Sequence, residues 1–324
     1  MMGGECSRVT CYRIKGLWNA TGNPRAVAWL NSRGRRLAPI EGEGGDGGTT
    51  NSGSVSVMLT MMRTKMDQIE FDERMQLNGW AVFEDALPDH LIQELKRDCL
   101  AWIEVCREYQ IANRINESGD GTGHHSVGQG KSIDAFLDMH LFHPYLSHFF
   151  NDVPYIMHAC NPVGGFPKLD TYIHKVHRDV ATYIPDFNMR INMLVMLDDF
   201  TLENGATRVL PGSHRQKEKP SDDAFNTDCE PILGKAGSVV LFNSYLWHKG
   251  GLNTTARNRV ALTLSFGLAF VKPQMDYARY LGEEHGRRLS DLSRQVLGYN
   301  ARVPTTLDEW YKPKSERLYW ANQG

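Results

Sequence analysis

Short apolar runs separated by glycine, proline and asparagine constrain the fold of this 324-residue chain more than any other feature. The runs recur between about residues 152 and 270. They cover residues 155–159, 171–176, 189–197, 207–210, 238–242 and 260–270. Short apolar or alternating runs bounded by turn-forming residues are typical of strands in an all-β sandwich or barrel. We therefore predict a strand-rich core over residues 151–272.

The segments that flank this core have the periodicity of helices. From Leu91 to Cys106, apolar residues recur every three or four positions, which predicts an amphipathic helix. The sequence thus predicts a largely helical N-terminal part over residues 66–150 and a helical, then irregular, segment over residues 273–324. Together with the core they form a single predicted domain, residues 66–324.

Residues 1–65 differ in composition from the rest. They include a polar, glycine-rich stretch over residues 42–53 that has too few apolar side chains to form a core. We predict a disordered extension, or a mis-assigned start with the natural first residue at one of the methionines between Met58 and Met66.

Composition and charge restrict the partners of the chain. The formal net charge is −2, which gives no electrostatic basis for binding nucleic acid or an anionic membrane. No apolar run approaches the ~20 residues of a membrane-spanning helix. The six cysteines form no Cys-x-x-Cys pair, and scattered cysteines suit a reducing compartment. We expect a cytoplasmic protein with a small-molecule substrate, and the oligomeric state is left open.

Three residues form a candidate metal site. His177 and Asp179 are two positions apart, so on a strand both side chains project to one side. A distant His248 would complete a set of two imidazoles and one carboxylate, which holds Fe(II) and leaves coordination positions open. Zinc accepts the same ligands. No catalytic residue is predicted beyond these ligands.

The sequence motifs around these three residues make the metal-site interpretation more specific. The chain contains His177-Arg-Asp179, Glu203-Asn-Gly205, Arg-Val-Leu-Pro-Gly-Ser-His over 208–214, and His248-x4-Asn253-x5-Arg259. Over about residues 70–270 this order and spacing resembles the phytanoyl-CoA dioxygenase family of iron- and 2-oxoglutarate-dependent oxygenases. The resemblance implies a mainly β fold with flanking helices, a double-stranded β-helix (jelly roll, cupin-like) with the metal at one mouth. It also implies Fe(II), 2-oxoglutarate as cosubstrate and O2.

Arg259 is the candidate for the far carboxylate of 2-oxoglutarate. The arginine of the family lies eleven residues after the distal histidine, which selects Arg259 over Arg257, and a guanidinium matches a carboxylate with two hydrogen bonds. The family often has a hydroxyl residue soon after the distal histidine, whereas here His248 is followed by Lys-Gly. We predict that Asn192 or Thr207 compensates, although a structural hydrogen bond is an equal alternative for Asn192.

The reaction that the resemblance implies is hydroxylation of an unactivated C–H bond of a small molecule. Related halogenases have a small residue in place of Asp179, so the carboxylate favours oxidation over halogenation. Desaturation, epimerisation and ring closure at the same iron remain alternatives, as does a non-catalytic jelly-roll binding protein. His124 and His125 are candidates for substrate contact, whereas His214 is predicted to brace the turn that contains it.

Overall fold

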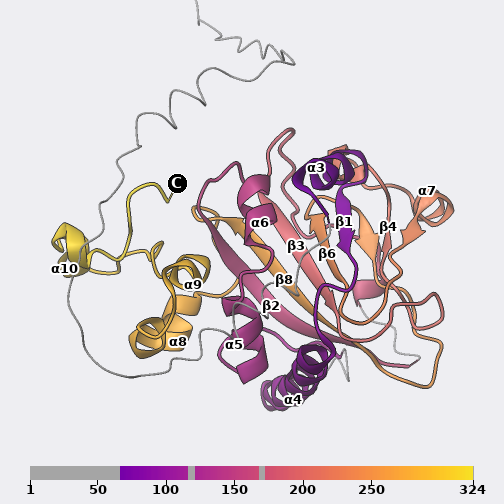
Figure 1. Cartoon of the computed structure of the whole chain (residues 1–324), viewed down its shortest axis with the longest axis horizontal. Helices are drawn as coiled ribbons and strands as arrows, with labels where there is room; N and C mark the ends of the chain where they lie inside the picture. Colours follow the sequence, from indigo (N-terminus) through magenta and orange to yellow (C-terminus); the bar gives the residue numbers. More distant parts are fainter. Residues whose placement is uncertain (1–65, 116–120, 168–171, 324) are drawn as a thin grey trace, which may run out of the picture. The chain divides into compact units, whose positions relative to one another are not determined.

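An antiparallel sheet of five strands organises the part of the chain that the structure describes, residues 66–115, 121–167 and 172–323. The structure is a computed structural model (Figure 1). In spatial order the strands are β1 (Trp80–Phe83), β6 (Val239–Asn243), β3 (Arg190–Met196), β8 (Arg259–Leu268) and β2 (Tyr155–Gly165). The extension predicted for residues 1–65 lies outside the described residues.

A second, smaller antiparallel sheet faces the first. Its strands are β5 (Glu230–Pro231), β4 (Arg208–Val209) and β7 (His248–Lys249), in that order. One hydrophobic cluster joins the two sheets, with Leu194 and Met196 of β3 and Val240 of β6 packed together with Val209 of β4. Alternate residues of the large sheet therefore face the small one, as the two-residue period of a strand requires.

Helices cover the opposite face of the large sheet (Figure 1). Met193 and Val195, which alternate with the residues above, belong to a separate cluster with Phe71, Leu95 and Leu146 from helices. The helices of the N-terminal part are α3 (Gln68–Leu77), α4 (Asp89–Ala112), α5 (Lys131–Asp138) and α6 (His143–Phe149). This face forms the dry core of the protein, and the other face is free to line a site.

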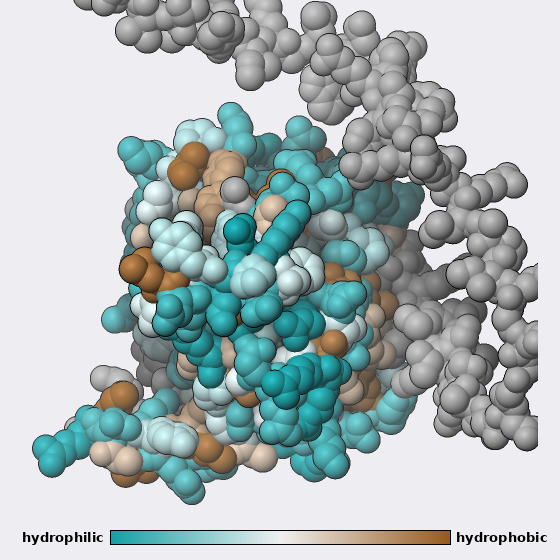
Figure 2. Space-filling model, turned by 90° about the vertical axis from the view of Figure 1, so that its left-hand side faces the viewer, coloured by the Kyte–Doolittle hydropathy of each residue, from teal (hydrophilic) through white to brown (hydrophobic). Residues whose placement is uncertain are grey.

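The remaining helices lie in one connection and in the C-terminal segment. They are α7 (Asp222–Asp228), α8 (Tyr277–Gly286), α9 (Asp291–Val296) and α10 (Leu307–Trp310), with 3-10 turns at Tyr172–His174, Ser213–Arg215 and Lys314–Glu316. No helix in the described ranges is long and apolar enough to cross a membrane. The face of the molecule seen in Figure 2 is mainly hydrophilic, with small hydrophobic groups scattered over it.

The structure confirms the antiparallel sheets and the flanking helices. Because three of the strands have only two residues each, more of the described residues lie in helices than in strands, so the chain is mixed α and β rather than mainly β. Near the end of the part predicted to be largely helical, residues 131–149 form two helices, α5 and α6, rather than one. Between them the backbone of His140 takes a φ of +48°, which no α-helix accommodates.

The strand predicted over residues 171–176 is wrong for the residues that the structure describes. Tyr172–His174 form a 3-10 turn, which closes where the N–H of Lys175 donates to the carbonyl oxygen of Tyr172 at 3.1 Å. The hydrogen bond stays within the four residues 172–175, and regular pairing with a neighbouring strand does not begin before His177.

His214 lies against the backbone of Gly79, just before β1. It is 9% exposed, and a Cβ atom added to the preceding segment at Gly79 would come within 2.4 Å of its Nδ1. Burial, helped by the neighbouring Arg215, lowers the pKa of His214 to about 4. The ring is therefore a neutral packing group, in keeping with the bracing role predicted for it.

This burial predicts a pH-dependent stability. Between its lowered folded pKa and the ordinary value near 6.5, the folded protein binds no proton on His214 whereas the unfolded chain does. The contribution to stability is therefore complete above about pH 6.5 and is lost as the pH falls toward 4. In urea unfolding, lowering the pH from about 7.5 to about 5.5 should destabilise the parent by about 1 kcal/mol more than His214→Gln. An equal loss in both proteins would contradict the assignment.

Candidate metal centre

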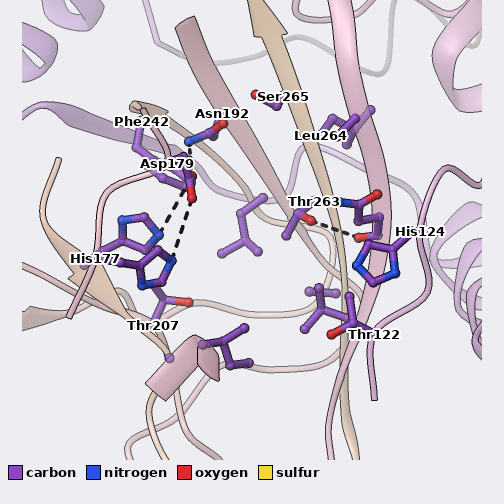
Figure 3. A pocket seen from close by; sticks show the side chains of 18 of the residues that line it. Thr122, His124, His177, Asp179, Asn192, Thr207, Phe242, Thr263, Leu264 and Ser265 are labelled. Atoms are coloured by element: carbon purple, nitrogen blue, oxygen red, sulfur yellow. Dashed lines mark hydrogen bonds and ion pairs between the residues drawn. The ribbon is translucent and has the colours of Figure 1, made fainter. Parts of the chain in front are cut away.

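Three side chains converge where the small sheet meets an irregular segment. His177, Asp179 and His248 each offer a ligand atom, and these atoms lie within 4.8 Å of one another (Figure 3). His177 and His248 exchange two backbone hydrogen bonds of 2.9 Å, and the N–H of Asp179 donates to the carbonyl oxygen of Ser244 at 3.1 Å. The predicted triad is thus assembled by an isolated bridge to β7 rather than by a regular strand.

The hydrogen bonds of the two imidazoles fix which nitrogen faces the centre. His177 Nδ1 lies 2.8 Å from the carbonyl oxygen of Lys175, and His248 Nδ1 lies 2.9 Å from that of Leu246. A carbonyl oxygen only accepts, so each Nδ1 carries the proton and each Nε2 keeps its lone pair. The two Nε2 atoms lie 3.7 and 3.9 Å from the oxygens of Asp179, too far for a hydrogen bond.

This donor set fits a divalent metal ion. Two neutral imidazole nitrogens and a carboxylate oxygen face one point, and their remaining ring nitrogens are anchored by backbone carbonyls, as metal-binding histidines require. Burial lowers the pKa of His248, Asp179 opposes that shift, and His177 adds to it. The ring is therefore neutral, which is the form that binds a metal.

Asn192 orients the carboxylate of this group. Its Nδ2 donates to Asp179 Oδ2 at 2.6 Å, and the residue is 5% exposed. Its amide oxygen forms no hydrogen bond to a described residue, so it is available to accept one from a ligand. The structure thus gives Asn192 a definite hydrogen-bond partner in the triad, and its predicted contact with 2-oxoglutarate stays a prediction.

The triad opens into a cavity of about 350 Å³ between the two sheets. Thr207, predicted to contact the cosubstrate, lines it beside the histidines, whereas Asn192 lies next to Asp179 with Ser265 beyond it (Figure 3). His124 also lines the cavity. His125 instead turns toward α8, where its Nδ1 lies 3.1 Å from Tyr277 Oη. Of the two histidines proposed for substrate contact, only His124 is in position.

Arg259 is a buried cation in the same cavity. It is 4% exposed, its guanidinium carbon lies 4.3 Å from the centre of the Phe200 ring, and its Nε has no hydrogen-bond partner. Burial lowers its pKa to about 10, against the opposing effect of Asp198, so it is charged at neutral pH. Arg257, the alternative, is exposed and does not line the cavity.

Asp198 fixes the start of the strand that carries Arg259. Its two carboxylate oxygens accept hydrogen bonds from the backbone N–H of Val260 at 2.8 Å and from Lys96 Nζ of α4 at 2.5 Å. The position of Arg259 is therefore tied both to the large sheet and to the longest helix.

Arg190 is a cavity residue that sequence reasoning missed. It is the first residue of β3 and lines the cavity from the side of Ser265. A signal was present in the sequence, because Arg190 opens an apolar strand in the same way that Arg259 opens β8. A charged residue at that position is expensive to bury unless it has a function or a partner.

The chain was compared with protein families, known protein sequences and solved structures. The family model of phytanoyl-CoA dioxygenase (PhyH) matches residues 75–261. An uncharacterized protein of Mycobacterium tuberculosis is 30% identical over 281 residues, which cover 81% of this chain and 97% of that protein. The dioxygenase FUM3 of Gibberella moniliformis is 31% identical over 150 residues, 44% of this chain and 49% of that protein. The crystal structure of AviO1 from Streptomyces viridochromogenes covers 65% of this chain and 99% of its own, with a TM-score of 0.49 and 20% identity.

The contact between Asn192 and Asp179 predicts an effect on metal affinity. Replacing Asn192 by leucine keeps the branched shape of the side chain but removes the hydrogen bond that orients the carboxylate. Loss of such a supporting contact typically weakens metal binding by about 10- to 100-fold. Calorimetric titration of Mn(II) into the parent, Asn192→Leu and the surface control Asn226→Leu should show the loss only in Asn192→Leu. Unchanged affinity in that variant would remove Asn192 from the metal centre.

Proposed function

Because the chain belongs to the phytanoyl-CoA dioxygenase family, we propose that it is a non-haem Fe(II)- and 2-oxoglutarate-dependent dioxygenase that hydroxylates an unactivated C–H bond of a small molecule. One observation carries the proposal. A two-histidine, one-carboxylate group and a buried guanidinium without a partner for its Nε line the same cavity.

His177, Asp179 and His248 would hold the iron through Nε2, a carboxylate oxygen and Nε2. The bound metal supplies the activation of oxygen and the oxidising power, which no side chain of the cavity provides. Three protein ligands leave the remaining positions of a six-coordinate ion for cosubstrate and oxygen. Asp179 also fills the place that a halide would need, which favours hydroxylation over halogenation.

Arg259 would bind the far carboxylate of 2-oxoglutarate. A buried cation is costly unless it is paired, and its Nε has no partner in the described structure. A carboxylate satisfies the planar fork of a guanidinium with two charge-assisted hydrogen bonds. We also propose Thr207 and the free amide oxygen of Asn192 as further polar contacts for the cosubstrate, in place of the hydroxyl that follows the distal histidine in many relatives.

The other residues of the cavity would position reactants and exclude water. The Phe242 ring packs edge-on against His248, with centroids 5.3 Å apart, and Leu194 and Ala261 provide apolar surface beside it. An apolar wall next to the ligands strengthens electrostatic interactions inside the site and protects reactive species from solvent. We further propose that the two facing sheets form a double-stranded β-helix and that the protein acts in the cytoplasm.

The activity test is the release of succinate from 2-oxoglutarate by purified protein with Fe(II), ascorbate and oxygen. The parent should form succinate slowly even without its main substrate, whereas Asp179→Ala, which lacks the carboxylate ligand, should form none. Arg259→Gln should raise the KM for 2-oxoglutarate by about 10- to 100-fold, the effect of losing charge-assisted hydrogen bonds.

The matched control is Arg257→Gln, an exposed arginine two residues from Arg259. It should behave as the parent. Activity that survives in Asp179→Ala would place the metal elsewhere. If the parent forms no succinate and the metal-loaded protein does not bind 2-oxoglutarate, a non-catalytic binding protein is favoured. Desaturation, epimerisation and ring closure differ from hydroxylation in the product formed once a substrate is known.

A further inference from the structure

Arg190 places a second cation in the cavity, and only neutral groups hold it. Its Nε and Nη2 donate to Ser265 Oγ at 3.2 and 2.6 Å, and its Nη1 lies 3.4 Å from the backbone oxygen of Asp179. In the described ranges no carboxylate forms an ion pair with Arg190. The Asp179 carboxylate acts on Arg190 only through space and would be committed to the metal, so this half-buried guanidinium has no ion-pair partner among the described residues.

The two arginines serve different parts of the cavity. Strands β3 and β8 are antiparallel, and Arg190 pairs with Gly267, eight residues after Arg259 on β8. Eight residues of extended strand span about 27 Å, far more than the length of one small dicarboxylate. Arg190 lies beside Asp179 and Ser265, at the end of the cavity away from Arg259. It is therefore not a second clamp on 2-oxoglutarate.

The charged side chains that line the cavity carry a net positive charge. Among the lining side chains, two arginines and one aspartate carry full charges. A divalent metal ion and doubly charged 2-oxoglutarate cancel each other, so one positive charge is left over. An unpaired charge away from bulk water is unfavourable. A ligand with a single negative charge restores the balance.

The free donors of Arg190 match a carboxylate. A guanidinium has five N–H groups, and the three contacts above leave one on each Nη nitrogen. Two N–H groups in one plane suit the two oxygens of a carboxylate. A phosphate monoester has a charge of about −1.5 to −2 and three oxygens, which exceeds both the surplus charge and the free donors.

We propose that the substrate is a small organic acid whose carboxylate binds Arg190, and that this residue determines specificity. The inference rests on the proposed function, since the cosubstrate must occupy the Arg259 end. A cavity of about 350 Å³ is at the lower end of the range for small-molecule sites, and the cosubstrate takes part of it. The body of the acid would lie against Leu264 and Ile173, which line the cavity.

The test uses a matched pair of probes, hexanoate and hexanamide, which differ in charge but hardly in shape. Protein loaded with Mn(II) and saturated with 2-oxoglutarate does not turn over, and its Arg259 end is filled. Binding is followed by calorimetry and by the relaxation of the probe's methyl protons by the manganese, which reports proximity to the metal. The parent should bind hexanoate at least tenfold more tightly than hexanamide, with methyl protons relaxed by the metal.

Variants of Arg190 show whether the residue binds the carboxylate of the probe or only supports Asp179. Arg190→Gln should lose the preference for hexanoate, Arg190→Lys should retain part of it, and Arg257→Gln should keep it in full. Mn(II) and 2-oxoglutarate should bind Arg190→Gln within a few-fold of the parent. A parent that binds both probes equally, or binds neither, overturns the inference, as does a preference that survives in Arg190→Gln. A tenfold or greater loss of Mn(II) affinity in Arg190→Gln would instead make the residue a brace for Asp179.

These outcomes are independent of the proposed cosubstrate. If 2-oxoglutarate fails to bind the parent, or binds Arg259→Gln as tightly as the parent, the proposed function fails. With Mn(II) alone, the hexanoate preference and its loss in Arg190→Gln can be measured in the Arg259→Gln background, where the probe has no guanidinium to bind at the other end of the cavity. The two ideas can therefore fail separately.

Discussion

The backbone bridge between His177 and His248 is the interaction on which the candidate site depends. Two hydrogen bonds of 2.9 Å join an irregular segment to a strand of only two residues. Without them, the segment that carries Asp179 would have no regular pairing to hold it near the small sheet, because the residues just before it form a 3-10 turn. The same local backbone also supplies the carbonyl oxygens that fix both imidazole tautomers. The same stretches of backbone therefore fix both the position of the two histidines and the ring nitrogen that carries the proton.

A second constraint comes from the two arginines that open neighbouring strands. Each is the first residue of its strand, and because β3 and β8 are antiparallel, their starts lie toward opposite ends of the sheet. The strand register therefore sets the length of the cavity between two cations. Arg259 is stacked on Phe200, and Asp198 anchors the strand beside it, whereas Arg190 is held by a hydroxyl and a carbonyl oxygen. Neither guanidinium is neutralised by a direct carboxylate contact in the described residues, which is unusual for buried charge and typical of ligand sites.

Local patterns in the sequence predicted those parts that depend on spacing. The two-residue interval between His177 and Asp179 suggested the triad, the resemblance of the surrounding sequence to the family made it specific, and the family's eleven-residue interval selected Arg259 over Arg257. Arg190 could not be assigned in this way, because its place in the cavity depends on the register between β3 and β8. The break between α5 and α6 depends on the positive φ of His140, and nothing in the apolar spacing of that segment encodes it. Long-range pairing and single-residue backbone conformations were the information that the sequence pattern lacked.

Within single strands of the large sheet, alternate side chains pack in the hydrophobic core or line the cavity. In β3, Met193 and Val195 pack into the helical core, whereas Asn192 and Leu194 line the cavity. Because successive side chains point to opposite faces, a substitution on the cavity face removes few contacts from the dry core. The polar wall formed by Arg190 and Ser265 can therefore change its chemistry while the alternating apolar residues keep the sheet in place. A fold of this kind can retain the metal ligands and alter the substrate, since the residues that would select the substrate are not those that hold the sheet to its helices.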